Sequence, residues 1–475
     1  MGSLVKNVLA DRYASETLRS IWSEEGKIRI ERTLWITIMK AQKTLGISIP
    51  DGVIEAYESK INEIDLDSIR EREKITKHDV KARIDEFCAL AGHEHIHKGM
   101  TSRDLTENVE QLQVYQSLQL ILNKSVACLS EIARLAQEYR SVVITGRSHN
   151  VPAQPTTLGR KIAMYGEEFA YAVEALKRFT ENYPVRGLKG AVGTQTDQLT
   201  LFNGDADKAL QLDSRVREHL GISKQWDAVG QVYPRSLDFE MVSALYQLTA
   251  GPSNFSRMVR LMAGHETASE GFAKGQTGSS AMPHKMNSRS CERVHGFRTI
   301  LSGYVTMAGN LAGDQWHEGD VSCSVVRRVI LPDTFFAIDG LLNTWRTVLE
   351  NLVVYPAMIA QELEQFTPFL MTTTLMMEAV KKGLGRETAH HLIKKHAVEE
   401  IQNRRQMAEM KNHLLERLAD DPEFPMNLEE LQVVTNRIHE QIGNADAQIS
   451  AFLDQVKTLE NQFPESKNQQ TESIL

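Results

Sequence analysis

One long helical period without a helix breaker restricts this fold more than any other feature. From about residue 104 to residue 139 the chain has no glycine and no proline, and its apolar residues recur every three or four positions. These residues are Leu105, Val109, Leu112, Leu122, Val126, Leu129, Ile132, Ala136 and Tyr139. Such a helix would be about 54 Å long, and one small domain cannot cover its apolar face. The sequence therefore predicts a bundle of long helices, completed by partner subunits.

The rest of the chain continues the helical pattern, and we expect an all-α fold. Helical periods are predicted at about 24–45, 156–180, 235–263 and 290–350, with shorter helices across 51–100. Pro252 should kink one of these helices, because the apolar period continues beyond it. No alternating apolar pattern is long enough to predict a β-sheet. We expect three helical domains, at 1–101, 102–354 (carrying a functional loop at 264–290) and 355–475.

Composition excludes several classes of protein. The chain has 475 residues, enough for about three domains, and its net charge of −8 argues against a nucleic-acid or membrane-surface binder. No apolar run approaches the length of a membrane span, and the amino terminus lacks the apolar core of a secretion signal. The four cysteines (Cys88, Cys128, Cys291 and Cys323) form no C-x-x-C pair. We expect a soluble, cytoplasmic protein without a membrane or nucleic-acid partner.

A polar segment at 275–293 differs from the helices on either side. It reads Gly-Gln-Thr-Gly-Ser-Ser-Ala-Met-Pro-His-Lys-Met-Asn-Ser-Arg-Ser-Cys-Glu-Arg and has almost no apolar period. Its glycines free the backbone, and Pro283 prevents a helix from continuing through it. A polar, basic loop between long helices is typical of movable functional groups on a rigid frame. From composition alone, a disordered surface loop explains the segment equally well.

The order of the residues in this loop decides between the two interpretations. Residues 278–287 resemble the signature loop of the fumarase/aspartase superfamily, G-S-S-x-M-P-x-K-x-N. With Ala281, His284 and the downstream Cys-Glu-Arg293, the segment is most similar to that of the adenylosuccinate lyase family. The resemblance implies release of fumarate from a phosphorylated small molecule that carries an N-linked succinyl group, as in adenylosuccinate or the succinylated imidazole-carboxamide ribotide of purine biosynthesis. It also implies a homotetramer with sites shared between subunits, and we expect no cofactor.

The resemblance assigns the base to this loop. Ser279 matches the family residue that removes the proton from Cβ of the succinyl group. A serine hydroxyl is a poor base, so its alkoxide needs cationic and N–H surroundings. Lys285, Asn287 and the backbone around Ser280 can supply them.

The same resemblance assigns an acid and a second histidine. His149, in the polar turn at 144–154, matches the family's general acid for the departing nitrogen, and Glu292 resembles the acid that orients it. His78 lies in a Lys-His-Asp-Val segment that matches the family's site, so the resemblance implies that it is catalytic as well as substrate-binding. By residue type alone, a loop histidine is usually inert, and a neighbouring His–Asp pair usually lies on the surface.

Other matched positions hold the phosphate and the carboxylates of the substrate. They are Arg12, Tyr13, Lys77, His78, Asp79, Thr101, Ser102, Gln231, Ser280, Lys285, Asn287, Arg293, Ser324 and Arg328. Thr101 and Asp104 also have capping-box spacing, which is a structural reason for both. One position departs from the family: many members have an arginine shortly after a Trp-x-Glu segment, where this chain has Gly319. Arg327 is a candidate to replace that cation.

Three alternatives stay open. The run from His93 to His97 has alternating histidines, but we interpret it as a polar loop and expect no metal site. Carboxymuconate cycloisomerase is another lyase of the superfamily with a similar loop. It handles no phosphate, whereas the Arg12-Tyr13 and Thr101-Ser102 pairs predict a phosphorylated substrate. A non-catalytic, crystallin-like helical oligomer is disfavoured because Ser279, His149 and Lys285 are all present.

Overall fold

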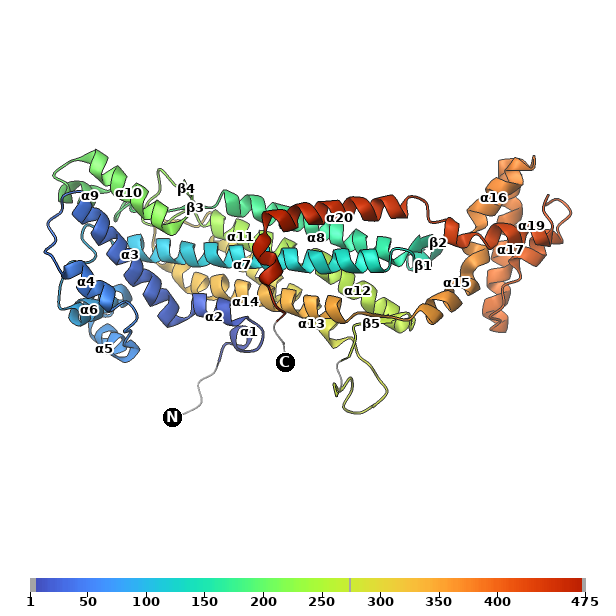
Figure 1. The fold of residues 1–475 in the computed structure, drawn as a ribbon, viewed down its shortest axis with the longest axis horizontal. Coiled ribbons are helices and arrows are strands. Elements are labelled where there is room, and N and C mark those ends of the chain that lie inside the picture. Colours follow the sequence, from blue (N-terminus) through green and yellow to red (C-terminus); the bar gives the residue numbers. More distant parts are fainter. Residues whose placement is uncertain (1–5, 273–274, 472–475) are drawn as a thin grey trace.

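Long helices form the centre of the molecule. The computed structural model describes residues 6–272 and 275–471. Helices that run along the long axis make up the central bundle (Figure 1): α7 (Ser102–Glu138), α8 (Leu158–Glu181), α11 (Ser236–Gln247), α12 (Ala250–Gly264), α13 (Arg289–Leu311) and α14 (Ser322–Asn351). α7 packs on α8 and α14, and α13 packs on α11, α12 and α14. The predicted all-α fold is confirmed.

The predicted long helix is α7, and local chemistry explains where it begins. Thr101 and Asp104 form a capping box, in which the Thr101 N–H donates to Asp104 Oδ2 at 2.8 Å. Leu105, Val109 and Ile132 are fully buried along its length. The helix extends over 37 residues, as the apolar period predicts.

Smaller helices gather at the two ends of the bundle (Figure 1). At one end lie α3 (Glu24–Thr44), α4 (Val53–Ser59), α5 (Leu66–Thr76), α6 (Asp79–Ala91), α9 (Thr196–Leu201) and α10 (Ala206–Leu220). α1 (Val8–Arg12) packs on α14, and α2 (Glu16–Trp22) packs on α3, α7 and α14. At the other end lie α15 (Pro356–Leu370), α16 (Thr372–Lys381), α17 (Arg386–Met407), α18 (Leu414–Ala419) and α19 (Leu428–Thr435). α16 to α19 bury a core of their own.

The end of the chain returns to the central bundle. After a 3₁₀ turn at Ile438–Glu440, α20 (Ala445–Gln462) packs on α7 and α8, and a second 3₁₀ turn follows at Pro464–Asn468. The division into three domains stays a prediction, and α20 packs mainly on α7 and α8 of the central bundle. Among residues 6–272 and 275–471, no helix combines the length and the apolar character needed to cross a membrane.

One local expectation was wrong. The turn at 144–154 is a β-hairpin of β1 (Val143–Ser148) and β2 (Val151–Thr157), a pairing between neighbouring strands that apolar alternation did not reveal. Further two-residue strands pair β3 (Pro184–Val185) with β4 (Lys224–Gln225) and β5 (Ala268–Ser269) with β6 (Val353–Val354).

The helical segment around Pro252 is interrupted just before the proline and continues beyond it, as expected. α11 ends at Gln247, Leu248 and Thr249 keep right-handed helical dihedrals, and α12 begins at Ala250. Pro252 thus lies in the first turn of α12, where a missing N–H is tolerated.

Candidate active site

A polar cavity of about 340 Å³ lies at the amino-terminal end of α7. We call it the α7 cavity. The α5–α6 junction, the first turns of α7 and the start of α14 line it. Six of the predicted ligands are among its lining residues: Lys77, His78, Asp79, Ser102, Ser324 and Arg328. The structure therefore brings together residues from three distant parts of the sequence.

The α5–α6 junction presents His78 as a hydrogen-bond donor. Lys77 ends α5 in the left-handed conformation (φ 54°), and His78 caps the amino terminus of α6. Its Nδ1 accepts a hydrogen bond from the Lys81 N–H at 3.4 Å. In the neutral ring the proton must then be on Nε2, so His78 can donate to an anion.

Asp79 connects this junction to Arg328. Its carboxylate accepts from the Val80 N–H at 2.8 Å and pairs with Arg83 at 3.3 Å and with Arg328 at 3.5 Å. Burial would raise the pKa of Asp79, but Arg83, the Val80 N–H and Arg328 outweigh burial and lower it. Asp79 therefore stays ionised and orients the guanidinium of Arg328, which is 71% exposed.

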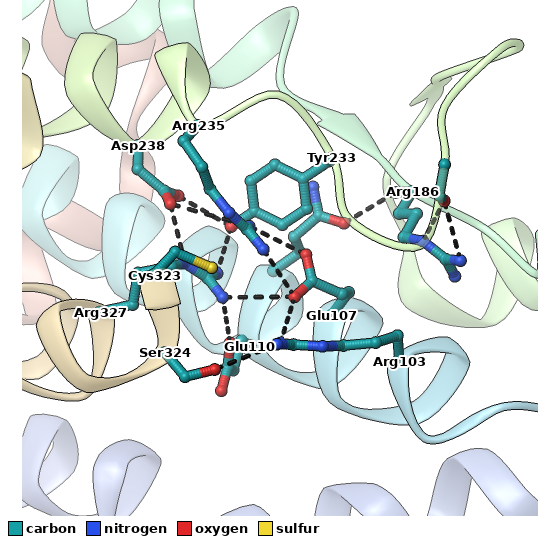
Figure 2. Close-up of polar contacts among 12 residues, drawn as sticks. Arg103, Glu107, Glu110, Arg186, Tyr233, Arg235, Asp238, Cys323, Ser324 and Arg327 are labelled. Carbon is teal, nitrogen blue, oxygen red and sulfur yellow. Dashed lines mark hydrogen bonds and ion pairs between the residues drawn. The ribbon is translucent and has the colours of Figure 1, made fainter. Parts of the chain in front are cut away.

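A buried ionic network connects α7, α11 and α14 (Figure 2), and its members Arg327 and Glu110 also line the α7 cavity. Arg327 is 2% exposed and pairs with Glu110 and with Asp238, each at 2.8 Å. Burial would raise the pKa of Glu110, but Lys27 and Arg327 lower it to about 2. Arg327 is thus held by buried carboxylates. The expectation that it replaces the missing family arginine does not fit this geometry.

The structure also explains why position 319 carries glycine. Gly319 has φ 127°, and a Cβ atom there would lie 2.7 Å from a methyl group of Val232. The neighbouring Gln231, a predicted ligand, donates its backbone N–H to the Glu318 carbonyl at 2.7 Å. The segment before α14 therefore packs too closely on residues 231–232 to hold an arginine side chain at 319.

A second group of predicted ligands lies between α1 and α13. The ring of Tyr13 packs edge-to-face on Phe297, with 5.0 Å between centroids. The guanidinium groups of Arg12 and Arg293 each lie 5.9 Å from the centroid of the Tyr13 ring. These three ligands are close to one another, but they are not among the lining residues of the α7 cavity.

The signature loop folds back on itself around Ser279. Ser279 Oγ accepts hydrogen bonds from the N–H groups of Met282 at 3.1 Å and Ala281 at 3.4 Å. Asn287 Nδ2 donates to the Gly278 carbonyl at 3.0 Å, and a Cβ atom at Gly278 would lie 2.6 Å from the Lys285 carbonyl oxygen. Ser280 and Lys285 are exposed. Backbone donors thus surround the hydroxyl of Ser279.

Glu270 anchors this loop, and sequence reasoning missed it. It is 4% exposed, and its two carboxylate oxygens accept from the N–H groups of Ser290 at 3.0 Å and Cys291 at 2.9 Å, in the first turn of α13. No sequence pattern connects a glutamate to a helix that begins 19 residues later. Of the predicted loop 264–290, residues 273–274 lie outside the described residues.

His149 and Glu292 do not meet within one chain. His149 and Asn150 form the hairpin turn between β1 and β2, with φ 51° and 63°. Glu292 lies in the first turn of α13, where it is 55% exposed and 3.7 Å from Arg260. In the described part of the chain, no contact joins it to His149.

The length of α7 separates His149 from the α7 cavity. The cavity is at Ser102, and the hairpin begins at Val143, just beyond the other end of the helix. A helix of 37 residues is about 55 Å long, and Figure 1 shows α6 and the hairpin at opposite ends of it. One chain therefore cannot place His149 and His78 around one small molecule.

The alternating histidines at 93–97 form a loop. His97 Nδ1 accepts from Trp35 Nε1 at 3.0 Å, and burial lowers the pKa of His97 to about 4. Within residues 6–272 and 275–471, no cluster of three or more His, Cys, Asp or Glu side chains is suited to hold a metal ion.

Comparisons with known proteins agree in sequence and in fold. Residues 11–301 match the lyase family model, and residues 368–452 match that of the adenylosuccinate lyase C-terminus. The chain is 32% identical over 454 residues to adenylosuccinate lyase of Schistosoma mansoni, and this match covers 94% of each protein. It is 32% identical over 457 residues to that of Saccharomyces cerevisiae, covering 94% of this chain and 93% of the relative.

Among solved structures, 3-carboxy-cis,cis-muconate lactonizing enzyme from Pseudomonas putida has a similar fold. The TM-score is 0.81, the identity is 19%, and the match covers 96% of this chain and 100% of the other. At this identity the similarity concerns the fold alone.

Proposed function

The chain belongs to the adenylosuccinate lyase family of the fumarase/aspartase superfamily, and from this premise we propose how its residues perform the reaction. It is a carbon–nitrogen lyase of purine biosynthesis: it eliminates fumarate from adenylosuccinate, which gives AMP, and from the succinylated aminoimidazole carboxamide ribotide. The observation that carries this function is the nearly full-length match to two adenylosuccinate lyases. The cycloisomerase alternative has support only from a shared fold.

We propose that Ser279 takes the proton from Cβ of the succinyl group. The C–H electrons then form the double bond of fumarate as the C–N bond breaks. The N–H groups of Ala281 and Met282 point at Ser279 Oγ and favour its alkoxide form. These contacts support the role, because they stabilise negative charge on an oxygen that is otherwise a weak base. We propose that Lys285, on the same loop, supplies the cation.

We propose that His149 donates a proton to the departing nitrogen and that Glu292 of another subunit orients it. In a hairpin turn, the ring of His149 can project from the bundle toward a partner chain. Within its own chain, Glu292 lies 3.7 Å from Arg260, and its carboxylate is half exposed. Such an exposed ion pair is weak, so Glu292 can instead pair with a histidine of another subunit.

The anionic groups of the substrate have two candidate binding regions. The α7 cavity presents Lys77, His78 and Arg328, with Ser102 and Ser324 as hydroxyl donors. The second region consists of Arg12, Tyr13 and Arg293, and Ser280 and Asn287 lie on the loop that precedes α13. Thr101 is next to Ser102, and the Gln231 N–H is bound to the Glu318 carbonyl ahead of α14, so both belong with the first region. We propose that these regions come from different subunits of a homotetramer. The length of α7 supports sharing, since His78 and His149 cannot meet within one chain.

The direct test of function is release of fumarate from adenylosuccinate, followed by ultraviolet absorbance, with AMP identified as the second product. Turnover is expected for the purified wild-type chain, and Ser279→Ala should lower kcat about 10²–10⁴-fold. Absence of turnover with a correctly folded, oligomeric wild type would contradict the proposal. Because the four cysteines are free thiols, we also propose the cytoplasm as the compartment.

A further inference from the structure

The α7 cavity contains a cation that the family resemblance leaves without a role. Arg103 lies in the first turn of α7, next to Ser102, and is 9% exposed. Its Nη2 donates to Ser324 Oγ at 3.1 Å and to the Asp320 carbonyl at 3.3 Å, and its Nη1 donates to Glu107 Oε1 at 2.9 Å. Arg103 therefore lies against a predicted anion ligand and beside the segment that contains Gly319.

The charges around Arg103 form a buried network. Arg103, Arg235 and Arg327 pair with Glu107, Glu110 and Asp238 (Figure 2). Lys27 also pairs with Glu110, at the edge of the network, where its side chain is 30% exposed. The carboxylate of Asp320 is exposed and accepts from Ser322. Which of the buried arginines can also hold an anion depends on the N–H groups that it has left and on whether it lines the α7 cavity.

Among the arginines of this network, Arg103 is the one that both lines the α7 cavity and has N–H groups left for an anion. Its contacts with other described residues use three of the five N–H groups of a guanidinium. Arg235, in contrast, is bound to Glu107 through both terminal nitrogens and does not line the α7 cavity. Arg327 lines the cavity but is held by Asp238, Glu110 and Glu107.

We propose that Arg103 binds the phosphate of the substrate and replaces the arginine that the backbone at Gly319 cannot hold. This inference rests on the proposed function. The phosphate would accept from the Arg103 guanidinium, from the Ser324 hydroxyl and from Arg328, so donors from α7 and α14 converge on it. A guanidinium suits this task, because it keeps its charge and Arg103 has an N–H group left on Nε and another on Nη1 to donate to a phosphate oxygen.

The test compares matched substitutions on the two sides of Glu107. Arg103 and Arg235 both pair with Glu107, and a lysine at either position keeps the positive charge but loses the planar guanidinium. Of the two, Arg103 lines the α7 cavity and Arg235 does not. Arg103→Gln removes the charge as well. The readouts are the rise in Tm that inorganic phosphate produces, its inhibition constant, and the KM for adenylosuccinate.

Arg103→Gln should raise the KM and the phosphate inhibition constant about 10- to 100-fold, as expected for loss of a charge-assisted contact, and should remove the phosphate-induced rise in Tm. Arg103→Lys should give a smaller change in the same direction. Arg235→Lys should lower the Tm without ligand and leave the phosphate inhibition constant within about twofold. Inhibition by fumarate, which has carboxylates and no phosphate, should stay unchanged in all three variants.

Unchanged phosphate inhibition in Arg103→Lys and Arg103→Gln would overturn the proposal. An equal effect in Arg235→Lys would do so too, because the network would then act as a whole. A rise confined to the fumarate inhibition constant would assign Arg103 to a carboxylate instead. If Arg103→Gln does not fold, Arg103→Lys decides. The Tm readout needs no catalysis, so a failure of the proposed function appears separately, as absent fumarate release by the wild type.

Discussion

Mixing two inactive variants tests whether active sites are shared between chains. The pair is His78→Gln and His149→Gln. Neither histidine is part of the buried core, so both variants should fold, and each should lose about 10²–10⁴-fold in kcat. After joint dissociation and reassociation, we expect activity to return.

The geometry of α7 sets the expected recovery. The helix holds the α7 cavity and the hairpin about 55 Å apart, whereas acid–base catalysis needs groups within about 3 Å of the reacting atoms. If each site takes the two histidines from different chains, random assembly of an equal mixture gives both intact histidines in about a quarter of the sites. If each site lies within one chain, every site keeps one defect.

Fumarate release is measured before and after reassociation, and native mass spectrometry confirms that mixed oligomers formed. Each variant taken through the same procedure alone is the control and should stay inactive. Mixed oligomers that recover no activity would refute the shared-site reasoning for these two residues. Replacing His78→Gln by Ser279→Ala extends the test to the signature loop.

Three further predictions follow from local contacts. Glu270→Ala should lower the free energy of unfolding by about 1–2 kcal/mol, because two N–H groups of α13 lose their acceptor, and urea denaturation measures it. The pKa of Asp79 is lowered, so its carboxylate stays ionised down to the ordinary aspartate pKa of about 4 and loses its charge only below it. The contribution of Asp79 to substrate binding should therefore hold down to about pH 4. Comparing the KM of the wild type with that of Asp79→Asn across this pH range measures it. The described part of the loop at 271–289 should exchange amide hydrogens rapidly without ligand and slowly with product, and equal, strong protection in both states would contradict closure.

Sequence alone identified the features that arise from neighbouring residues. The apolar period and the capping box predicted α7, because helix hydrogen bonds and caps connect residues three or four positions apart. The order of residues 278–287 identified the lyase loop, since it matches all seven positions that the superfamily pattern specifies. The limits of this reasoning were also local. The hairpin of β1 and β2 was missed, because apolar alternation does not reveal its strands.

Only the tertiary structure decided what each arginine does. In the linear order Arg327 is 8 residues from Gly319 and Arg103 is 216 residues away, so the sequence favoured Arg327. Packing reverses this order: Arg327 is held among buried carboxylates from α7 and α11, whereas Arg103 faces the α7 cavity beside Ser324. Glu270 and Val232 were invisible for the same reason. Charge pairing and steric exclusion depend on distances between segments far apart in sequence, and those distances exist only after the helices have packed.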